Sequence, residues 1–330
     1  MAEIAPPSSI LQRAAPLPEW FVPPDLNPRG VKLEPLELGG GVYALLADRP
    51  PVNNSGFVVG ERGVLVVDAC LNGAMAMQIQ EEIRRVTDKP ILYLVVTSNH
   101  GDHHLGAYAF PSETRVVAHR LTAASMRDFE GEVGFVRWLL GEEAAREELE
   151  GVRPRSADIL FDQRLVLDLG GREVEIHRFG PGESSGDTVV YVRDAELAFT
   201  GNLVRAEGSV PCLMEHPAAE FCQTIKRFRQ ALSLRLIIPG HGVLGTPAAL
   251  DLYEQYLEQL LRRTEELHRQ GLGREAAVTL GEELWTTFGP VAEEDAAVAY
   301  ARGLHRLNAE TTFDRCCDGD SGEWPQVATS

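Results

Sequence analysis

The stretch TSNHGDHHLG, residues 97–106, follows the apolar run ILYLVV, which has the length and composition of a buried strand. His100, Asp102 and His103 therefore lie in a loop at the C-terminal end of a strand. Such a loop can turn ligands two and three positions apart toward one point, and Gly101 gives its backbone freedom to do so. Imidazole and carboxylate groups bind zinc and similar metals. Taken alone, the stretch fits a metal site and a chance polar cluster equally well.

Three more polar side chains follow predicted strands further along the chain. His241 lies in the turn PGHG after the strand LRLII, and Asn202 ends the strand of the motif FTGN. Glu183 lies in GPGESSGD, a turn between two predicted strands. Because open sheets place their ligands at strand ends, we expect these side chains to meet the 97–106 loop.

The rest of the chain predicts an α/β fold with two sheets. The expected elements are a β-meander (31–68), a helix (72–87), the strand before the polar loop, helices (119–150), four strands starting with ILFDQRLVLDL (159–201), a helix (217–232), the strand LRLIIPG and three helices (247–309). Two halves that each carry a sheet and flanking helices predict an αββα sandwich of two mixed sheets.

We expect four regions along the chain. Residues 1–30 are rich in proline and would form an arm that wraps the domain or a partner, or else a disordered tail. Residues 31–246 form the sandwich domain, and the helices of 247–312 pack on it as an extension. Those helices either enclose a substrate or build the surface of a homodimer. Residues 313–330 read as a polar tail.

Composition excludes some classes of function. The net charge of −18 argues against a nucleic-acid groove or binding to an anionic membrane, since both need clustered lysine and arginine. No apolar run approaches the roughly 18 residues of a spanning helix, and the N-terminus lacks the apolar core of a signal peptide. The five cysteines follow no disulfide or metal-knuckle spacing, and we expect reduced thiols in a cytoplasmic protein. They are Cys70, Cys212, Cys222, Cys316 and Cys317.

The motifs as a set resemble the metallo-beta-lactamase superfamily over about residues 31–270. The metal loop of that family is Thr-His-x-His-x-Asp-His. Four of its positions are matched here, by Thr97, His100, Asp102 and His103. Ser98 stands where the family has its first histidine. The strand ending VLVVDA is similar to the family's strand with a structural aspartate, which places Asp68 in that role.

Three later family elements are matched or altered. His241 matches the histidine of the family's Pro-Gly-His-Gly turn. Glu183 stands where the family has a histidine, and Asn202 stands where the family has the aspartate that bridges two metals. An asparagine cannot bridge two cations as a carboxylate does.

The resemblance implies one firm metal site. The second site of the family keeps three ligands, namely Asp102, His103 and His241. Three protein ligands and an open position are typical of catalytic zinc. The first site would retain a poor set, namely Ser98, His100 and Glu183. We therefore expect one zinc ion, with the first site weak or empty.

The function that the resemblance implies is metal-dependent hydrolysis of an ester, thioester, lactone or amide bond in a small molecule. Zinc lowers the pKa of bound water to about 7. Asp102 would orient that water or accept its proton, and His100 or His104 would act as general acid or base. The altered ligands are also compatible with a binding protein of reduced activity, or with elimination or rearrangement in biosynthesis. Iron-dependent oxidation and phosphodiester cleavage fit poorly, because they need the missing ligands.

Several other side chains have two interpretations each. Glu215 would contact the substrate or begin a solvated helix. Phe135 and Trp138 would form a lid over the site or pack a helix on the core. His305 lies on a predicted helix and is expected at the surface.

Overall fold

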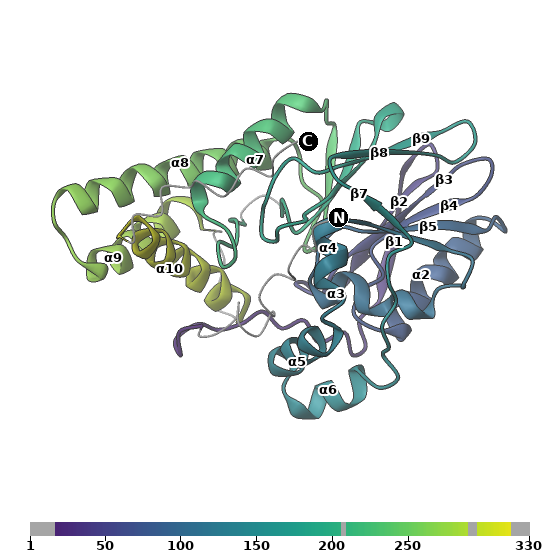
Figure 1. Cartoon of the computed structure of the whole chain (residues 1–330), viewed down its shortest axis with the longest axis horizontal. Coiled ribbons are helices and arrows are strands. Elements are labelled where there is room, and N and C mark those ends of the chain that lie inside the picture. The colour runs from purple at the N-terminus through teal and green to yellow at the C-terminus, as the bar shows by residue number, and fades with distance from the viewer. Residues whose placement is uncertain (1–16, 206–208, 290–295, 318–330) are drawn as a thin grey trace, which may run out of the picture.

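The computed structural model describes residues 17–205, 209–289 and 296–317 (Figure 1). Residues 1–16 of the expected arm and 318–330 of the expected tail lie outside the described residues. In the described part of the chain, the strands form one sheet of seven strands and one of five. Helices flank both sheets, which confirms the αββα sandwich with a helical C-terminal extension (Figure 1).

The first sheet combines an antiparallel half and a parallel half. In spatial order its strands are β1 (Leu33–Gly39), β2 (Val42–Ala47), β3 (Ser55–Val59), β4 (Val64–Val67), β5 (Ile91–Val96), β6 (Arg115–His119) and β7 (Ile159–Phe161). Strands β1 to β4 pair antiparallel, which confirms the expected meander. Strands β4 to β7 pair parallel through crossovers that contain helices. Strand β6 was not predicted, since no element was expected between the 97–106 loop and the helices from residue 119 onward.

The second sheet contains five strands, and its last strand, β8, is the second part of a run that was expected as one strand. Its strands are β12 (Leu236–Pro239), β11 (Leu197–Gly201), β10 (Val189–Val192), β9 (Glu173–His177) and β8 (Arg164–Asp168). The run ILFDQRLVLDL was expected as a single strand, but its first part is β7 of the other sheet. The exposed residues Asp162 and Gln163 form the crossing between the sheets, and both Asp162 carboxylate oxygens accept hydrogen bonds from Arg120.

The two sheets bury an apolar layer between them. Leu65 and Val95 from the first sheet and Val190 and Ile238 from the second belong to the same buried cluster. Strands β4 and β10, with sequences VLVV and VVYV, are buried at every position. Fully buried strands do not alternate in polarity, which explains why these runs are continuously apolar.

Helices cover the outer faces of the sandwich. Helix α2 (Gly73–Val86) packs Met75, Ile79 and Ile83 on the first sheet, and Asn72 caps it by accepting a hydrogen bond from the Met75 amide. On the second sheet lies α7 (Ala218–Ala231). The remaining short helices follow the first sheet's parallel strands. They are α3 (Gly101–His104), η1 (Leu105–Ala109), α4 (Arg120–Ser125), α5 (Phe129–Leu140) and α6 (Glu142–Glu148), with η2 (Arg193–Ala195) in the second sheet.

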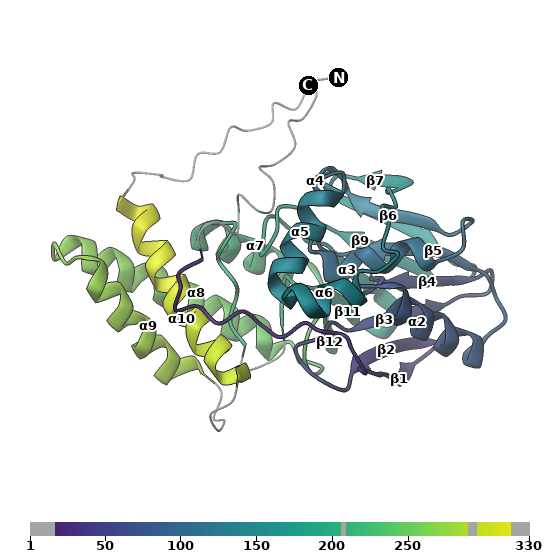
Figure 2. The ribbon, with the colours of Figure 1, turned by 90° about the horizontal axis from the view of Figure 1, so that it is seen from below.

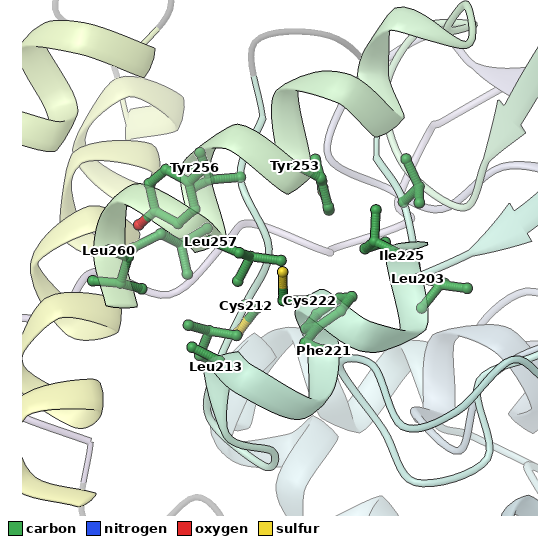
Figure 3. Close-up of a cluster of buried hydrophobic side chains, with 14 of the residues drawn as sticks. Leu203, Cys212, Leu213, Phe221, Cys222, Ile225, Tyr253, Tyr256, Leu257 and Leu260 are labelled. Atoms are coloured by element: carbon green, nitrogen blue, oxygen red, sulfur yellow. The ribbon is translucent and has the colours of Figure 1, made fainter. Parts of the chain in front are cut away.

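The C-terminal helices extend the core of the second sheet. They are α8 (Ala248–Arg269), α9 (Arg274–Phe288) and α10 (Ala296–Cys317). Figure 3 shows Leu257 and Leu260 of α8 beside Phe221 and Cys222 of α7, in one buried cluster. Helix α10 continues to Cys317, beyond the boundary at 312 expected from the sequence.

His305 lies in that core, so its expected surface position was wrong. Its side chain is 1% exposed, and its ring meets the rings of Tyr256 and Trp285 edge-on. Helix α10 presents this face to α8 and α9, and the edge-on contacts make an imidazole a suitable packing group there.

The described part of the arm wraps the molecule. Figure 2 shows the segment of residues 17–30 running along α10 and on to β1. Phe21 meets the ring of Tyr300 at 6.0 Å between centroids, and the Arg306 guanidinium lies 3.9 Å from the centre of the Trp20 ring. The segment therefore ties the last helix to the first sheet.

Two further expectations concern the whole chain. Among the described residues, no helix combines the length and the apolar character needed to cross a bilayer. Cys70, Cys212 and Cys222 are buried free thiols, and the side chain of Cys317 lies outside the described residues.

Candidate functional site

Asp68 organises the loop that follows β5. One of its carboxylate oxygens accepts a hydrogen bond from the Thr97 amide at 2.8 Å. The other accepts from the Thr97 hydroxyl at 2.7 Å and lies 2.8 Å from Nδ1 of His103. A carboxylate on Nδ1 fixes the histidine ring and leaves Nε2 to bind a metal, an arrangement common in metal sites.

His241 is held in the same manner from the other sheet. Its Nδ1 lies 2.6 Å from the carbonyl oxygen of Pro51, so Nδ1–H donates and Nε2 keeps a free electron pair. Asn54 anchors the turn by donating to the Pro239 carbonyl at 3.0 Å. Burial lowers the pKa of His241 to about 3, despite the nearby Asp102 carboxylate. The ring is therefore neutral at physiological pH, the form that binds metals.

Asp102 completes a set of three converging ligand atoms. Its Oδ2 lies 3.3 Å from Nε2 of His241 and 3.9 Å from Nε2 of His103. In the described residues, these three side chains form the one group whose possible ligand atoms all lie within 4.8 Å of one another.

The same atoms lack the partners that buried polar groups need. Asp102 Oδ2 and His103 Nε2 are buried without a hydrogen-bond partner. An unsatisfied buried polar atom costs about 1–3 kcal/mol, so two such atoms facing one point need a shared partner. A divalent cation supplies it, and the donor set of two imidazoles and one carboxylate suits zinc. The residues therefore fit a metal ion.

A second polar group lies beside this centre and is built around His100. Its Nε2 is 3.4 Å from a carboxylate oxygen of Glu215, and its Nδ1 is 3.7 Å from Glu183 and 3.1 Å from the amide nitrogen of Asn202. Burial lowers the pKa of His100, but the two glutamates outweigh it and raise that pKa to about 10. Ser98 lies behind Asn202, with 3.5 Å between the serine oxygen and the amide nitrogen.

Glu183 does not stand as a free ligand, because Arg205 holds it. Nη2 of Arg205 donates to both carboxylate oxygens of Glu183, at 2.8 and 3.0 Å. Nη1 of the same guanidinium donates to the Tyr300 hydroxyl at 2.8 Å. Ser98, His100, Glu183 and Asn202 are thus neighbours joined by hydrogen bonds and an ion pair, with a guanidinium among them.

Two residues of the 97–106 loop differ from expectation. His104 is buried and points Nε2 at the Asn99 carbonyl, 3.2 Å away, and it is not among the described residues that line the pocket. Gly101 does not adopt a left-handed conformation, so it is needed for space rather than for backbone freedom. A Cβ there would lie 2.8 Å from Glu132 Oε1 and from Leu105.

A pocket of about 940 Å³, including its open mouth, leads to these groups. His100, Asp102, Asn202, Glu215 and His241 lie along its polar wall. The opposite walls are apolar and come from two segments, residues 17–26 of the arm and helix α5. Those side chains are Leu17, Phe21, Pro23, Pro24 and Leu26 of the arm, and Phe135, Val136, Trp138, Leu139 and Leu140 of α5.

Helix α5 therefore serves the pocket as well as the core. Val136 is buried, whereas Trp138 is half exposed and stacks on Phe135 with 5.8 Å between ring centroids. Glu132 of the same helix is buried and accepts a hydrogen bond from the Gly101 amide. Burial raises the pKa of Glu132 to about 8.

Comparison with known families agrees with this architecture. A family model described as the metallo-beta-lactamase superfamily matches residues 48–241, more than half of the chain. The chain belongs to the metallo-beta-lactamase superfamily. The matched range starts within the meander and ends at His241, so it includes all three residues of the candidate metal group.

Two characterised proteins are distant relatives of this chain in sequence. The chain is 24% identical over 236 residues to 2,4-dinitroanisole O-demethylase subunit alpha of Nocardioides sp. (strain JS1661), a match that covers 70% of this chain and 62% of that protein. It is 24% identical over 197 residues to acyl-coenzyme A thioesterase MBLAC2 of Homo sapiens, covering 56% of this chain and 67% of the relative. The chain thus spans about two thirds of each relative's length.

Solved structures share the fold at low identity. A metallo-beta-lactamase from Pontibacter korlensis matches with a TM-score of 0.53 and 18% identity. The match covers 69% of this chain and 99% of the chain of that enzyme. The stereoselective inverting sec-alkylsulfatase Pisa1 from Pseudomonas sp. has a TM-score of 0.63 and 14% identity, covering 90% of this chain and 52% of its own. The latter likeness extends well beyond the 194 residues of the family match.

The sequence analysis missed several residues of the site, and all of them lie outside the motifs of the superfamily. Arg205 follows the bridging position by three residues, and nothing in its surroundings in the sequence points to Glu183. Glu132 and Phe21 reach the pocket from a helix and an arm that no motif marks. The proximity of Arg205 to the FTGN motif was the one available signal.

Proposed function

We propose that this protein is a zinc-dependent hydrolase that cleaves an ester, thioester, lactone or amide bond in a small molecule with a sizeable apolar part. The observation that carries the proposal is a cluster of three converging metal-ligand atoms, two of them buried without a partner, at the polar wall of an otherwise apolar pocket. The thioesterase named among the relatives supports a thioester within this range.

The metal would be held by Asp102, His103 and His241, with one zinc ion per chain. Asp68 and the Pro51 carbonyl keep both imidazoles oriented toward it. A zinc ion bound there would supply Lewis-acid chemistry and water acidic enough to attack at neutral pH.

The chain's own residues bind and orient the substrate around that centre. The apolar walls from α5 and the arm would take the acyl or aryl part and exclude bulk water from the polar wall. Asn202 and His100 lie next to the centre in the lining of the pocket. His100 contacts protein groups through both nitrogens, and the amide nitrogen of Asn202 contacts His100 and Ser98. These contacts favour a role in shaping the polar wall over free proton transfer.

A panel of substrates tests the proposal directly. Zinc-loaded protein would be assayed with p-nitrophenyl esters and acyl-coenzyme A thioesters of two to twelve carbons, a lactone, an anilide and an aryl methyl ether. We expect turnover of at least one ester, thioester, lactone or amide, with kcat/KM rising with the length of the apolar chain. His241→Ala should lower kcat/KM at least ~100-fold, since second-sphere changes alone cost 10–100-fold.

A matched variant separates loss of the metal centre from general damage. His268→Gln alters a histidine of α8, far along the C-terminal helices, and should leave kcat/KM unchanged. Zinc-loaded, folded protein that cleaves none of these bonds would refute the hydrolase. Cleavage of the aryl ether alone would move the activity toward that named for the Nocardioides relative.

A further inference from the structure

We propose that the guanidinium of Arg205 takes the place of a second metal ion, supplying the positive charge beside Glu183 and restricting the chain to one zinc. This inference rests on the metal part of the proposed function, the centre at Asp102, His103 and His241. It is independent of the bond cleaved and of the substrate.

Four hydrogen bonds fix the position of Arg205, although its Nε is buried without a partner. Its side chain donates to both oxygens of Glu183 and to the Tyr300 hydroxyl, and its backbone amide donates to the Tyr253 hydroxyl at 3.0 Å. Tyr300 belongs to α10 and Tyr253 to α8. The C-terminal helices therefore hold the guanidinium at the polar wall.

One fixed positive charge already pairs with Glu183 in this half of the polar wall. Glu183 and Glu215 provide two negative charges, and Arg205 provides one fixed positive charge, with His100 lying between the two glutamates. Arg205 is 9% exposed and Glu183 is 4% exposed, so water screens this pair weakly. A divalent cation entering here would meet a guanidinium already bound to its best anionic ligand.

The neutral side chains in this half of the polar wall would bind a metal only weakly. Asn202 offers a neutral amide and Ser98 a neutral hydroxyl, both weak ligands compared with carboxylate or imidazole. Glu183 is the one carboxylate among the expected ligands of the first site, and Arg205 already occupies it.

Removal of the guanidinium tests the inference through metal content and thermal stability. Arg205→Met keeps much of the side-chain volume but leaves Glu183 buried and unpaired, which should lower Tm by roughly 10 °C. With excess zinc followed by desalting, we expect one zinc per wild-type chain and two per Arg205→Met chain. A second equivalent of zinc should raise Tm of the variant but not of the wild type.

Two further variants isolate the cause. In Glu183→Gln/Arg205→Met neither charge remains, so we expect one zinc and no second increase in Tm. Asn202→Asp adds a carboxylate while Arg205 stays in place, and it should still hold one zinc, which tests the inference even if Arg205→Met does not fold.

Clear results would overturn the inference. Two zinc ions in the wild type or in Asn202→Asp would show that Arg205 excludes nothing. A folded Arg205→Met chain with one zinc and no second increase in Tm would show the same. No zinc in the wild type would remove both this inference and the metal centre, whereas one zinc without hydrolysis would count against the proposed reaction alone.

Discussion

At the scale of single residues, the site is defined by which atoms are left without a partner. The resemblance to the superfamily predicted Asp102, His103 and His241 as one ligand set, and the structure brings their possible ligand atoms within 4.8 Å of one another. Motif spacing could not show that Glu183 is already paired, because Arg205 reaches it from a separate loop 22 positions away. Long-range pairing of this kind leaves no periodic signal in a sequence.

Asp68 gives the first prediction at this scale. In Asp68→Asn the amide can still accept from the Thr97 backbone, but its NH₂ group faces Nδ1–H of His103, so that two donors oppose each other. The ring of His103 loses its anchor, and zinc affinity should fall roughly 10–100-fold. Competition with a chromophoric chelator measures this change.

The control is a carboxylate with a backbone partner far from the centre. Asp48 accepts a hydrogen bond from the Lys32 amide at an exposed site. Asp48→Asn should therefore bind zinc as the wild type does. Equal affinities in the Asp68 and Asp48 variants would contradict a role for Asp68 in holding His103.

At the scale of elements, sequence patterns located the helices better than the sheet boundaries. The three helices expected within 247–309 are present as α8, α9 and α10, and glycines flank α9 at both ends. The strand expected from residue 159 divides into β7 and β8, because an alternating run carries no record of which sheet each half joins. The transition depends on Asp162 and its partner Arg120, which is again a distant contact.

Gly106 gives a prediction about how tightly these elements meet. It lies where η1 passes the loop after β4, and a Cβ would be 2.3 Å from the Ala69 carbonyl oxygen and 2.8 Å from that of Asn72. Backbone atoms cannot move aside as side-chain ends do. Gly106→Ala should therefore lower the free energy of unfolding by about 3 kcal/mol, the upper end for overpacking.

Urea unfolding compares this change with a glycine in open space. Gly273 precedes α9 with a φ of −91°, and a Cβ there would meet nothing within 4 Å. Gly273→Ala should change the free energy of unfolding by less than about 0.5 kcal/mol. Similar losses of the free energy of unfolding in both variants would mean that the backbone around Gly106 can shift to make room for a Cβ.

At the scale of the whole molecule, the C-terminal helices and the sandwich act as one body with a shared core. His305 lies in that core, and burial lowers its pKa to about 4, compared with about 6.5 in an unfolded chain. Between these values the unfolded chain binds the proton and the folded chain does not. The neutral ring therefore supports stability above pH 6.5, and that support is lost as pH falls toward 4.

His305→Phe should remove this pH dependence while it keeps an aromatic ring in place. From pH 7 to pH 5, the wild type should lose about 2 kcal/mol more of its free energy of unfolding than the variant does. Urea titrations at both pH values measure the difference. Parallel losses in the two proteins would show that His305 takes up its proton in the folded state.

The arm that crosses from α10 to β1 has a consequence for how the protein is made. Residues 17–26 leave the ribosome well before Tyr300 and Arg306, on which Phe21 and Trp20 rest, have been synthesised. At the usual speed of synthesis the interval is on the order of tens of seconds. During that time Leu17, Phe21 and Leu26 have no docking surface, so one wall of the pocket must be added after the rest of the domain has emerged.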